Sequence, residues 1–486
     1  MRLSELLREV EFEGSIKNDF DIKFVTDDSR LVRPGALFVC IRHRSFDGHT
    51  AAAEALASGA AAVVTQERLG LENELNVADS RAAYARLCAA LCGHPERKLR
   101  MIGVTGTNGK TTVTTLIRNI LSDSGIKTLL TGTVCNRLGE ESLPSGLTTP
   151  KPPELYSLLS RAVLSGCEAC VAEASSQALA QGRLEGIAFD AAVFTNITRD
   201  HLDYHDTFEN YLAAKKKLFE HSEVSAVNLD DPRADEIIAA SSGKTVTFST
   251  VLDCADYTAK NISLLPEGVS FELVSKGRIE HINFASPGLF SVSNAMAAAV
   301  CAINLGVDPR SAAQSLARSK GVCGRLERVE CGTPYSVIID YAHTPDGLEQ
   351  VLRALRPSCR GKLIVLFGCG GDRDKTKRPL MGAAACKYAD TVVVTSDNPR
   401  SEEPMRIIGD ILKGTDKKRR GLFIEEDRRR ATALALSLAK PGDTVLLAGK
   451  GHEKYQLICG EKLPLDERET VREILGLPHD TGRKKP

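Results

Sequence analysis

The chain of 486 residues lacks tryptophan, is poor in aromatic residues (5%) and has no net charge, because 63 Lys and Arg balance 63 Asp and Glu. Without a long-range positive field, neither nucleic acid nor an anionic membrane surface is an expected partner. No apolar run is long enough for membrane insertion, and the acidic N-terminus is atypical of a signal peptide. We therefore expect a cytoplasmic protein, with its 14 cysteines reduced. The single C-x-x-C pair, Cys167 and Cys170, lies in an apolar run and favours a buried strand over a zinc site.

Apolar runs alternate with helical patterns along the chain, which predicts an α/β fold, and the length indicates several domains. We predict three: a small N-terminal α/β domain (1–97), a central domain with a mostly parallel, P-loop-type sheet (98–329) and a C-terminal Rossmann-like α/β domain (330–486). A polar linker with Pro95 marks the first boundary. In parallel sheets, ligands bind beyond the carboxyl ends of the strands, so polar residues that follow strands are the candidate site residues.

A glycine-rich turn follows the predicted strand Met101 to Val104 and precedes a helical pattern. Backbone N–H groups of such a turn, together with a helix N-terminus, form a cradle for phosphate. Val104 stands where the general P-loop pattern has its first glycine, so an ordinary strand-to-helix turn is the alternative. We expect Lys110 on the terminal phosphates and the Thr111 hydroxyl on Mg²⁺. The candidate ATP-binding residues of this loop are Gly106, Thr107, Asn108, Gly109, Lys110, Thr111 and Thr112.

The segment from Thr105 to Thr112 resembles the ATP loop of the Mur ligase superfamily, which comprises ATP-dependent amino-acid ligases. Further segments fit the same family: Glu173 at the end of an apolar run, His201 in an Asn-x-x-x-Asp-His-Leu-Asp pattern, and Lys215 in Ala-Lys-x-x-Leu-Phe. In the family this lysine is carbamylated, which requires that it shed its proton, and burial makes that easier. The resemblance implies that Thr111, Glu173, His201 and carbamylated Lys215 hold Mg²⁺.

The resemblance also implies further substrate contacts. The family has an Asn-x-x-Asn pair for the adenine side of ATP; here Ser291 replaces the first Asn and Asn294 remains. Arg325 is implied to be an ATP phosphate contact or a hinge contact. Asp340 and His343 are candidates for orienting nucleotide or amine, and with Lys110, Glu173, His201 and Lys215 they complete the candidate catalytic set. In the segment from Glu173 to Arg183, Ala174 and Gln177 stand where the family usually has Val and His. The implied contacts of a UDP-N-acetylmuramoyl dipeptide are Ser29, Thr148, Thr149, Ser175, Gln181 and Arg183.

The tetrapeptide Asp397-Asn398-Pro399-Arg400 follows an apolar run in the C-terminal segment. Alone it would be read as a type I turn. In the Mur ligases that add the third residue of the peptidoglycan stem, it accompanies meso-diaminopimelate, whose distal carboxylate a guanidinium can bind bidentately. Charge-assisted bonds of this kind contribute on the order of 1.5–3 kcal/mol. The implied diaminopimelate contacts are Arg373, Asp397, Asn398, Pro399, Arg400, Gly449 and Glu453.

The resemblance implies a monomeric ATP- and Mg²⁺-dependent ligase in peptidoglycan synthesis. It would phosphorylate the D-glutamyl carboxylate of UDP-N-acetylmuramoyl-L-alanyl-D-glutamate and join meso-2,6-diaminopimelate through the acyl phosphate, so its partners are small molecules. Three alternatives stay open: a lysine-adding ligase, a folylpolyglutamate synthase, and a nucleotide-binding regulatory protein without ligase activity. The tail from Thr481 to Pro486 is expected to be frayed.

Overall fold

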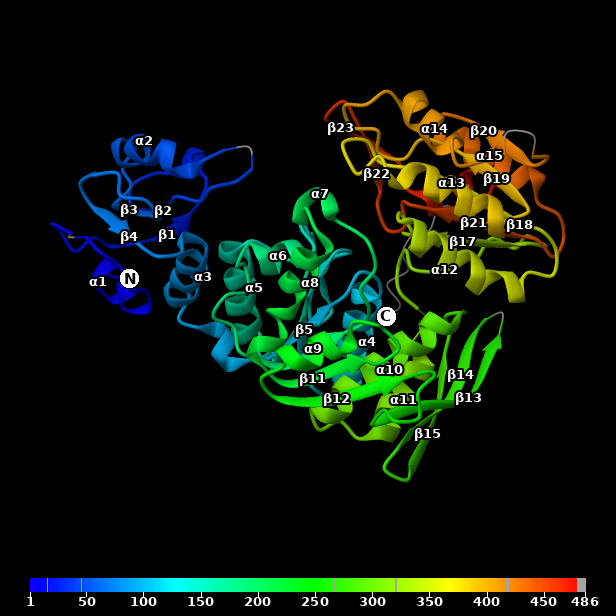
Figure 1. Ribbon diagram of the computed structural model, residues 1–486, viewed down its shortest axis with the longest axis horizontal. Coiled ribbons are helices and arrows are strands. Elements are labelled where there is room, and N and C mark those ends of the chain that lie inside the picture. Colours follow the sequence, from blue (N-terminus) through cyan, green and yellow to red (C-terminus); the bar gives the residue numbers. More distant parts are fainter. Residues whose placement is uncertain (15, 45, 266, 320, 417–418, 479–486) are drawn as a thin grey trace.

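The computed structural model describes residues 1–478 except 15, 45, 266, 320, 417 and 418, so the predicted frayed tail lies outside the described residues. Three bodies follow one another along the chain, each with its own sheet (Figure 1). Within the described residues, no helix combines the length and apolar character that a bilayer span requires.

The N-terminal body is a four-stranded parallel sheet in the order β1-β2-β3-β4. Its strands are β1 (Phe24–Thr26), β2 (Ala36–Val39), β3 (Ala62–Thr65) and β4 (Glu74–Asn76). Helices α1 (Leu3–Leu6), α2 (Ala52–Ala57) and α3 (Ser80–Leu91) accompany it. Asp79 begins α3 because its carboxylate accepts bonds from the N–H groups of Arg81 and Ala82.

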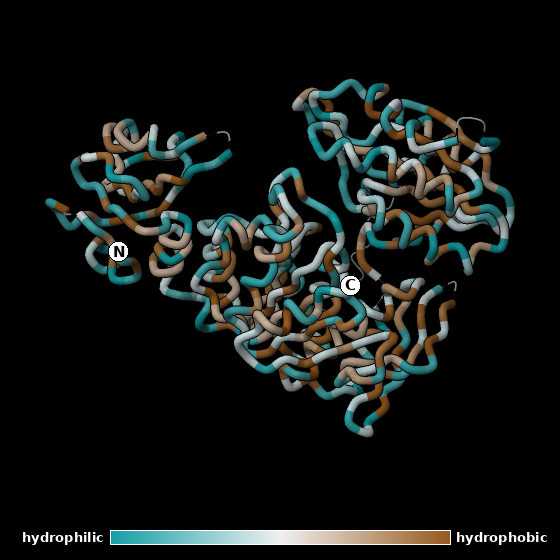
Figure 2. Tube along the Cα trace, in the orientation of Figure 1, coloured by the Kyte–Doolittle hydropathy of each residue, from teal (hydrophilic) through white to brown (hydrophobic). Residues whose placement is uncertain are grey.

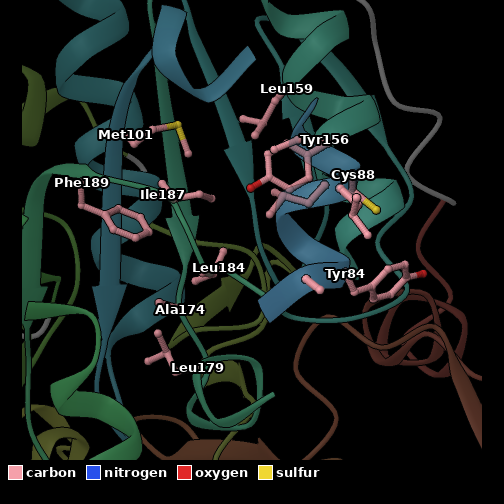
Figure 3. Close-up of a cluster of buried hydrophobic side chains, with 14 of the residues drawn as sticks. Tyr84, Cys88, Met101, Tyr156, Leu159, Ala174, Leu179, Leu184, Ile187 and Phe189 are labelled. Atoms are coloured by element: carbon pink, nitrogen blue, oxygen red, sulfur yellow. The ribbon is translucent and has the colours of Figure 1, made fainter. Parts of the chain in front are cut away.

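One apolar cluster joins this body to the central one. Tyr84 and Cys88 of α3 lie beside Tyr156 and Leu159 of α5 (Pro152–Leu164), all of them buried (Figure 3). The cluster extends from Leu3 into the central sheet without interruption. Burying apolar area of this kind contributes roughly 25 cal/mol per Å², so the two bodies are held together as one packed unit.

The central body is an eleven-stranded sheet in the order β15-β14-β13-β12-β11-β10-β5-β9-β6-β7-β8. The strands from β13 to β6 in this order run parallel, and β14, β15, β7 and β8 add antiparallel edges. The parallel strands are β12 (Lys244–Ser249), β11 (Ser222–Asn228), β10 (Phe189–Phe194), β5 (Arg100–Thr105), β9 (Ala169–Glu173) and β6 (Thr128–Thr131), with β13 (Tyr257–Leu265) beyond them. The antiparallel strands are β14 (Gly268–Ser275), β15 (Arg278–Phe284), β7 (Asn136–Leu138) and β8 (Glu141–Leu143).

Helices cover both faces of this sheet, since residues of β11, β10, β5, β9 and β6 enter two separate apolar clusters. One face holds α5 with α6 (Ser176–Ala180), α8 (Phe208–Lys216) and α9 (Ala234–Ala240). The other holds α4 (Lys110–Asp123), α10 (Leu289–Asn304) and α11 (Pro309–Arg318). Helix α10 is apolar around most of its circumference, as expected of a helix buried on several sides.

The C-terminal body is a six-stranded sheet in the order β16-β17-β21-β18-β19-β20, with β16 alone antiparallel to its neighbour. Its strands are β16 (Glu327–Val329), β17 (Ser336–Asp340), β18 (Leu363–Phe367), β19 (Thr391–Val394), β20 (Leu422–Ile424) and β21 (Thr444–Ala448). Apolar segments form its interior while the surface turns are hydrophilic (Figure 2). Its helices are α12 (Pro345–Leu355), α13 (Lys377–Tyr388), α14 (Pro404–Leu412), α15 (Arg428–Leu438) and α16 (Glu467–Ile474).

The predicted α/β class with a mostly parallel central sheet is confirmed. The sequence analysis did not predict the antiparallel strands β14 and β15, the edge strands β7, β8, β16 and β20, or the hairpin of β22 (Tyr455–Ile458) and β23 (Glu461–Pro464). Most of these strands are short or half-exposed, so their apolar residues form no continuous run.

Candidate active site

The carboxyl ends of five parallel central strands meet at one edge of the sheet, in the order β11-β10-β5-β9-β6. The phosphate-loop segment follows β5, and Glu173 ends β9. Thr195 and Asn196 follow β10, and Thr133 comes shortly after β6. The topology therefore collects polar residues from distant segments at the place where ligands bind in parallel sheets.

The loop between β5 and α4 is shaped by Gly109, the residue that precedes the helix. Its φ of 90° is left-handed, and a Cβ atom there would lie 2.5 Å from Asn294 Oδ1. The Lys110 ammonium folds back over the loop and donates to the carbonyls of Gly106 (2.8 Å) and Thr107 (2.9 Å). Burial lowers the pKa of Lys110, while Glu173 and Asp200 oppose this effect.

The carboxylate of Glu173 is buried and held by three donors. Its Oε2 atom accepts bonds from the hydroxyls of Thr111 (3.1 Å) and Thr133 (2.9 Å), and Oε1 accepts from the Thr133 N–H (2.8 Å). The predicted pair Thr111 and Glu173 is thus in direct contact. Thr133 was not predicted, although its place in Gly132-Thr133 just beyond β6 is the signal that could have found it.

Lys215 is one of the largest fully buried side chains, at 1% exposure. Its Nζ lies 4.6 Å from the centre of the Tyr211 ring. Burial and then the nearby Lys110 hold the pKa of Lys215 well below its usual range. The lowered pKa makes loss of the proton easier, as the predicted modification of this lysine requires.

His201 lies between β10 and α8 with a left-handed φ of 53°, and its Nε2 is 3.4 Å from Asp200 Oδ2. Burial lowers the pKa of His201, as do Lys110 and Lys215, while Asp200 raises it. Asp200 itself has a pKa below its usual value: burial alone would raise it, but the nearby His201, His343 and Lys377 and a bond from the His201 N–H lower it. Asp200 is a residue that sequence reasoning left without a role.

Three candidates, Arg325, Asp340 and His343, come from the start of the C-terminal body. Arg325 donates to the Thr111 hydroxyl (3.1 Å) and lies over the Tyr341 ring (4.6 Å). Asp340 accepts from the N–H groups of Leu326 and Ala342, both at 2.7 Å, so it fixes local backbone. Burial raises the pKa of Asp340, and Arg325 opposes this effect.

His343 has its Nδ1 3.0 Å from the Tyr341 carbonyl. Because a carbonyl only accepts, Nδ1 carries the hydrogen of the neutral ring and Nε2 is left as an acceptor. Burial, reinforced by Lys377, lowers the pKa of His343 to about 4. The ring is therefore neutral at physiological pH.

The candidates for the dipeptide ligand form a connected network. Arg183 donates to Gln181 Oε1 (2.7 Å) and to the Thr149 carbonyl (2.6 Å), and the Thr149 hydroxyl donates to Ser175 (3.1 Å). The Thr148 hydroxyl meets that of Thr133 at 3.0 Å.

Ser29 begins the 3-10 helix η2 (Ser29–Leu31) in the N-terminal body. Asp27, two residues earlier, accepts from Lys151 (3.0 Å), which follows Thr149 in the chain. The network and the N-terminal candidate thus lie on adjoining segments.

One cavity of about 550 Å³ gathers most of these candidates, from the central body and from the first loop of the C-terminal one. Ser29, Gly106 and Gln181 are not among its lining residues, nor are the diaminopimelate candidates. Ser291 lines it, but its hydroxyl is bonded to Ser286 and to the Pro287 carbonyl. The lining candidates are Thr107, Asn108, Gly109, Lys110, Thr111, Thr112, Thr148, Thr149, Glu173, Ser175, Arg183, His201, Lys215, Asn294, Arg325, Asp340 and His343.

Among the residues that the structure describes, no three His, Cys, Asp or Glu side chains are grouped as a metal site. The predicted magnesium ligands include a threonine and a modified lysine, which are outside those four types. The Thr111 hydroxyl and the Glu173 carboxylate, in mutual contact, are oxygen donors of the kind that Mg²⁺ takes. The donor chemistry of this part of the cavity therefore fits that ion.

The diaminopimelate candidates lie together at the carboxyl ends of β19 and β21. Arg400 donates to the Gly371 carbonyl (2.7 Å), and Arg373 belongs to the loop that follows β18. Asn398 Nδ2 donates to Glu453 Oε2 (2.9 Å). Gly449 has a left-handed φ of 108° beside Asp397. The structure therefore brings the predicted set together as one cluster, distinct from the large cavity.

The chain matches three family descriptions in order. Residues 21–89 match "Mur ligase family, catalytic domain", 104–302 match "Mur ligase middle domain", and 324–451 match "Mur ligase, glutamate ligase domain". It is 43% identical to the UDP-N-acetylmuramoyl-L-alanyl-D-glutamate--2,6-diaminopimelate ligase of Syntrophomonas wolfei, covering 98% of this chain and 99% of that one. The enzyme of the same name from Caldanaerobacter subterraneus is also 43% identical, with the same coverage. The chain belongs to the Mur ligase family.

A solved structure of a UDP-N-acetylmuramoyl-L-alanyl-D-glutamate--2,6-diaminopimelate ligase is 34% identical to this Mur ligase, with a TM-score of 0.71, and covers 98% of this chain and 99% of that one. The folylpolyglutamate synthase of Mycobacterium tuberculosis is 18% identical with a TM-score of 0.63, a likeness of fold alone. The predictions of the family, the fold class and an ATP-dependent, peptide-bond-forming ligase are confirmed.

Proposed function

We propose that this Mur ligase joins meso-2,6-diaminopimelate to the D-glutamate of UDP-N-acetylmuramoyl-L-alanyl-D-glutamate, with conversion of ATP to ADP and phosphate, in peptidoglycan synthesis. The observation that carries the proposal is the single cavity where the ATP loop, Glu173 and the buried Lys215 converge. The proposal is supported by relatives of that activity, which are 43% identical over nearly the whole chain.

The chain's own groups would act by position and charge. Lys110, Arg325 and the N–H groups of residues 106–112 bind the phosphates of ATP, and Asn294 binds the adenine side of the nucleotide. The network of Thr148, Thr149, Ser175, Gln181 and Arg183, with Ser29, binds the UDP-linked dipeptide. Thr111, Glu173, His201 and carbamylated Lys215 would hold Mg²⁺, which would supply positive charge to the transferred phosphoryl group.

The reaction proceeds in two displacements. A carboxylate oxygen of the D-glutamyl residue attacks the γ-phosphorus of ATP, and ADP leaves. The diaminopimelate amine then attacks the acyl carbon, the C–N bond forms as the C–O bond to phosphate breaks, and the amine loses a proton. His343, neutral and with Nε2 as an acceptor, is the group that we assign to orient that amine or the nucleotide, together with Asp340.

The C-terminal cluster would hold the amino acid. Arg373 and Arg400 are the cations for the distal carboxylate, and Glu453 and Asp397 are the acids for the amino group beside it. We further propose that the three bodies correspond to the predicted domains 1–97, 98–329 and 330–486, except that β16 (Glu327–Val329) belongs to the C-terminal one, and that the enzyme acts in the cytoplasm as a monomer. Sedimentation of the purified protein tests the last point.

The deciding experiment measures phosphate release and product mass with ATP, Mg²⁺, the UDP-linked dipeptide, and either meso-diaminopimelate or L-lysine. We expect turnover with diaminopimelate and little with lysine. Arg400→Ala should lose that preference by roughly ten- to a hundredfold, the equivalent of one charge-assisted contact. Equal turnover of both amino acids by the unmodified enzyme would refute the specificity, and no turnover with either would refute the reaction.

A further inference from the structure

Lys450, directly after Gly449, is a buried cation inside the diaminopimelate cluster. Its side chain is fully buried, although lysine is rarely found without solvent contact. Its Nζ donates to Asn398 Oδ1 (2.8 Å) and Glu453 Oε2 (2.7 Å) and lies 3.7 Å from Asp397 Oδ1. All three partners are predicted contacts of the amino acid, whereas Lys450 itself was given no role by the sequence.

Asn398 belongs to the same network and leaves little of its amide for a ligand. Its Oδ1 accepts from Lys450 and from the Leu457 N–H (2.9 Å), and its Nδ2 donates to Glu453 Oε2. Within the described part of the chain, both bonds recorded at the Glu453 carboxylate end on Oε2. The other oxygen, Oε1, is thus the atom of Glu453 that remains for a bound amino group.

Charges within this network are balanced. Asp397 and Glu453 supply two negative charges, and Lys450 and Arg400 supply two positive ones, while Arg428 beside Asp397 is paired with the buried Glu467 (2.7 Å). Asp397 Oδ1 is buried without a hydrogen-bond partner among the described residues, so the nearby Lys450 is its main compensation. Without Lys450, the buried Asp397 and the largely buried Glu453 would repel each other and would outnumber Arg400, so the pocket would favour a lone cation.

We propose that Lys450 is a positioning and specificity-determining residue. Its ammonium holds Glu453 in place for the amino group at the distal centre of the amino acid. It also keeps the charge of the pocket matched to a zwitterionic centre, as in diaminopimelate, rather than to the lone ammonium of lysine. This inference rests on the proposed function, because the ligand that it concerns is the amino acid of that reaction.

Lys450→Met tests the proposal with ATP and the UDP-linked dipeptide saturating. We expect kcat/KM for diaminopimelate to fall at least tenfold, mainly through KM, while the KM for ATP stays within twofold. The fall for L-lysine should be smaller, so the preference for diaminopimelate shrinks several-fold. Lys454→Met is the matched control: it removes the same charge four residues later, where the side chain is 78% exposed, and should leave all constants within twofold.

A double-mutant cycle separates positioning from general damage. In a Glu453→Gln background, Lys450→Met should change KM for diaminopimelate by less than threefold, because the carboxylate that it positions is gone. If Lys450→Met alone fails to fold, the comparison of Glu453→Gln with the double variant decides instead. Additive effects, or an equal loss toward diaminopimelate, lysine and ATP, would overturn the proposal.

Failure of the proposed function itself would be visible in the unmodified enzyme. If that enzyme does not turn over diaminopimelate, calorimetric binding of diaminopimelate to it and to Lys450→Met still reports on the pocket. Weaker binding to the variant, with Lys454→Met unchanged, would support the role of Lys450. No binding to the unmodified enzyme, or equal binding to both, would overturn it.

Discussion

Replacing Gly109 with alanine should impair ATP use by a predictable amount. The residue has φ 90°, where a non-glycine residue costs of the order of 1–3 kcal/mol. The added Cβ would also lie 2.5 Å from Asn294 Oδ1, whereas ordinary contact begins at 3.4 Å, so the loop or Asn294 must move by about 0.9 Å (3.4 − 2.5). A misplacement of about 1 Å in a reacting site can cost about a hundredfold in rate. We therefore expect kcat/KM for ATP to fall by ten- to a hundredfold.

Gly125→Ala is a control for backbone strain. Gly125 follows the C-terminal end of the same helix, α4, has φ 84°, and has no atom within 4 Å of an added Cβ. Both variants should lose a few degrees of melting temperature, but Gly125→Ala should keep the KM for ATP of the unmodified enzyme. Because the chain has no tryptophan, melting is best followed by calorimetry or circular dichroism.

The comparison rests on the close contact with Asn294, which Gly125 lacks. If both variants keep the KM for ATP of the unmodified enzyme, the close approach of the loop to α10 does not affect ATP binding. If both lose ATP affinity equally, loss of helix α4 explains the effect, and the reasoning from Gly109 is wrong.

Three further outcomes are expected. Lys215→Arg should reduce turnover at least a hundredfold with little change in KM for ATP, because a guanidinium does not shed its proton or become carbamylated. Steady-state kinetics at fixed bicarbonate measure this loss, and full activity would refute the role of carbamylated Lys215. Arg325→Met should raise the KM for ATP by ten- to a hundredfold, since it removes a charged bond to Thr111, and an unchanged KM would count against the phosphate assignment. Burial lowers the pKa of His205 and His343 from 6.5 to about 4 in the folded protein. Between pH 6.5 and 4 the unfolded chain therefore binds more protons than the folded one, and the free energy of unfolding decreases as the pH falls through that window. Melting temperature should therefore be lower at pH 5 than at pH 7, and His205→Asn should lessen that difference.

The central strands and the phosphate loop could be predicted because their sequence signals are local. Met101 to Val104 is a short apolar run bounded by a glycine turn, and the structure has β5 there. Strand β15, from Arg278 to Phe284, is exposed or half-exposed except at Ile282 and Phe284 and pairs with a neighbour in sequence, so no apolar run marks it. Such edge strands depend on the sheet that they join, which a short window of sequence does not contain.

Site residues that belong to a sequence motif could be predicted, whereas residues that only packing brings into the site could not. Thr133 contacts Glu173, 40 residues later, because β6 and β9 are neighbours in the sheet. Lys450 gave no signal, since a lysine in a polar loop is ordinarily exposed. Its burial follows from the meeting of the β19 and β21 loops, which is a property of the sheet order.

The distribution of apolar contacts indicates which body moves during catalysis. The N-terminal and central bodies share one continuous cluster, so separating them would expose buried side chains such as Tyr84 and Tyr156. The two clusters of the C-terminal body are formed almost wholly by its own residues, with Phe290 as the central-body neighbour packed against them. Across that boundary the described contacts include single hydrogen bonds such as Asn108 to the Asp346 carboxylate (3.1 Å), each of which contributes at most about 1.5–3 kcal/mol. A hinge therefore costs least between the central and C-terminal bodies, and the cluster around Lys450 can travel as a preformed unit toward the ATP loop.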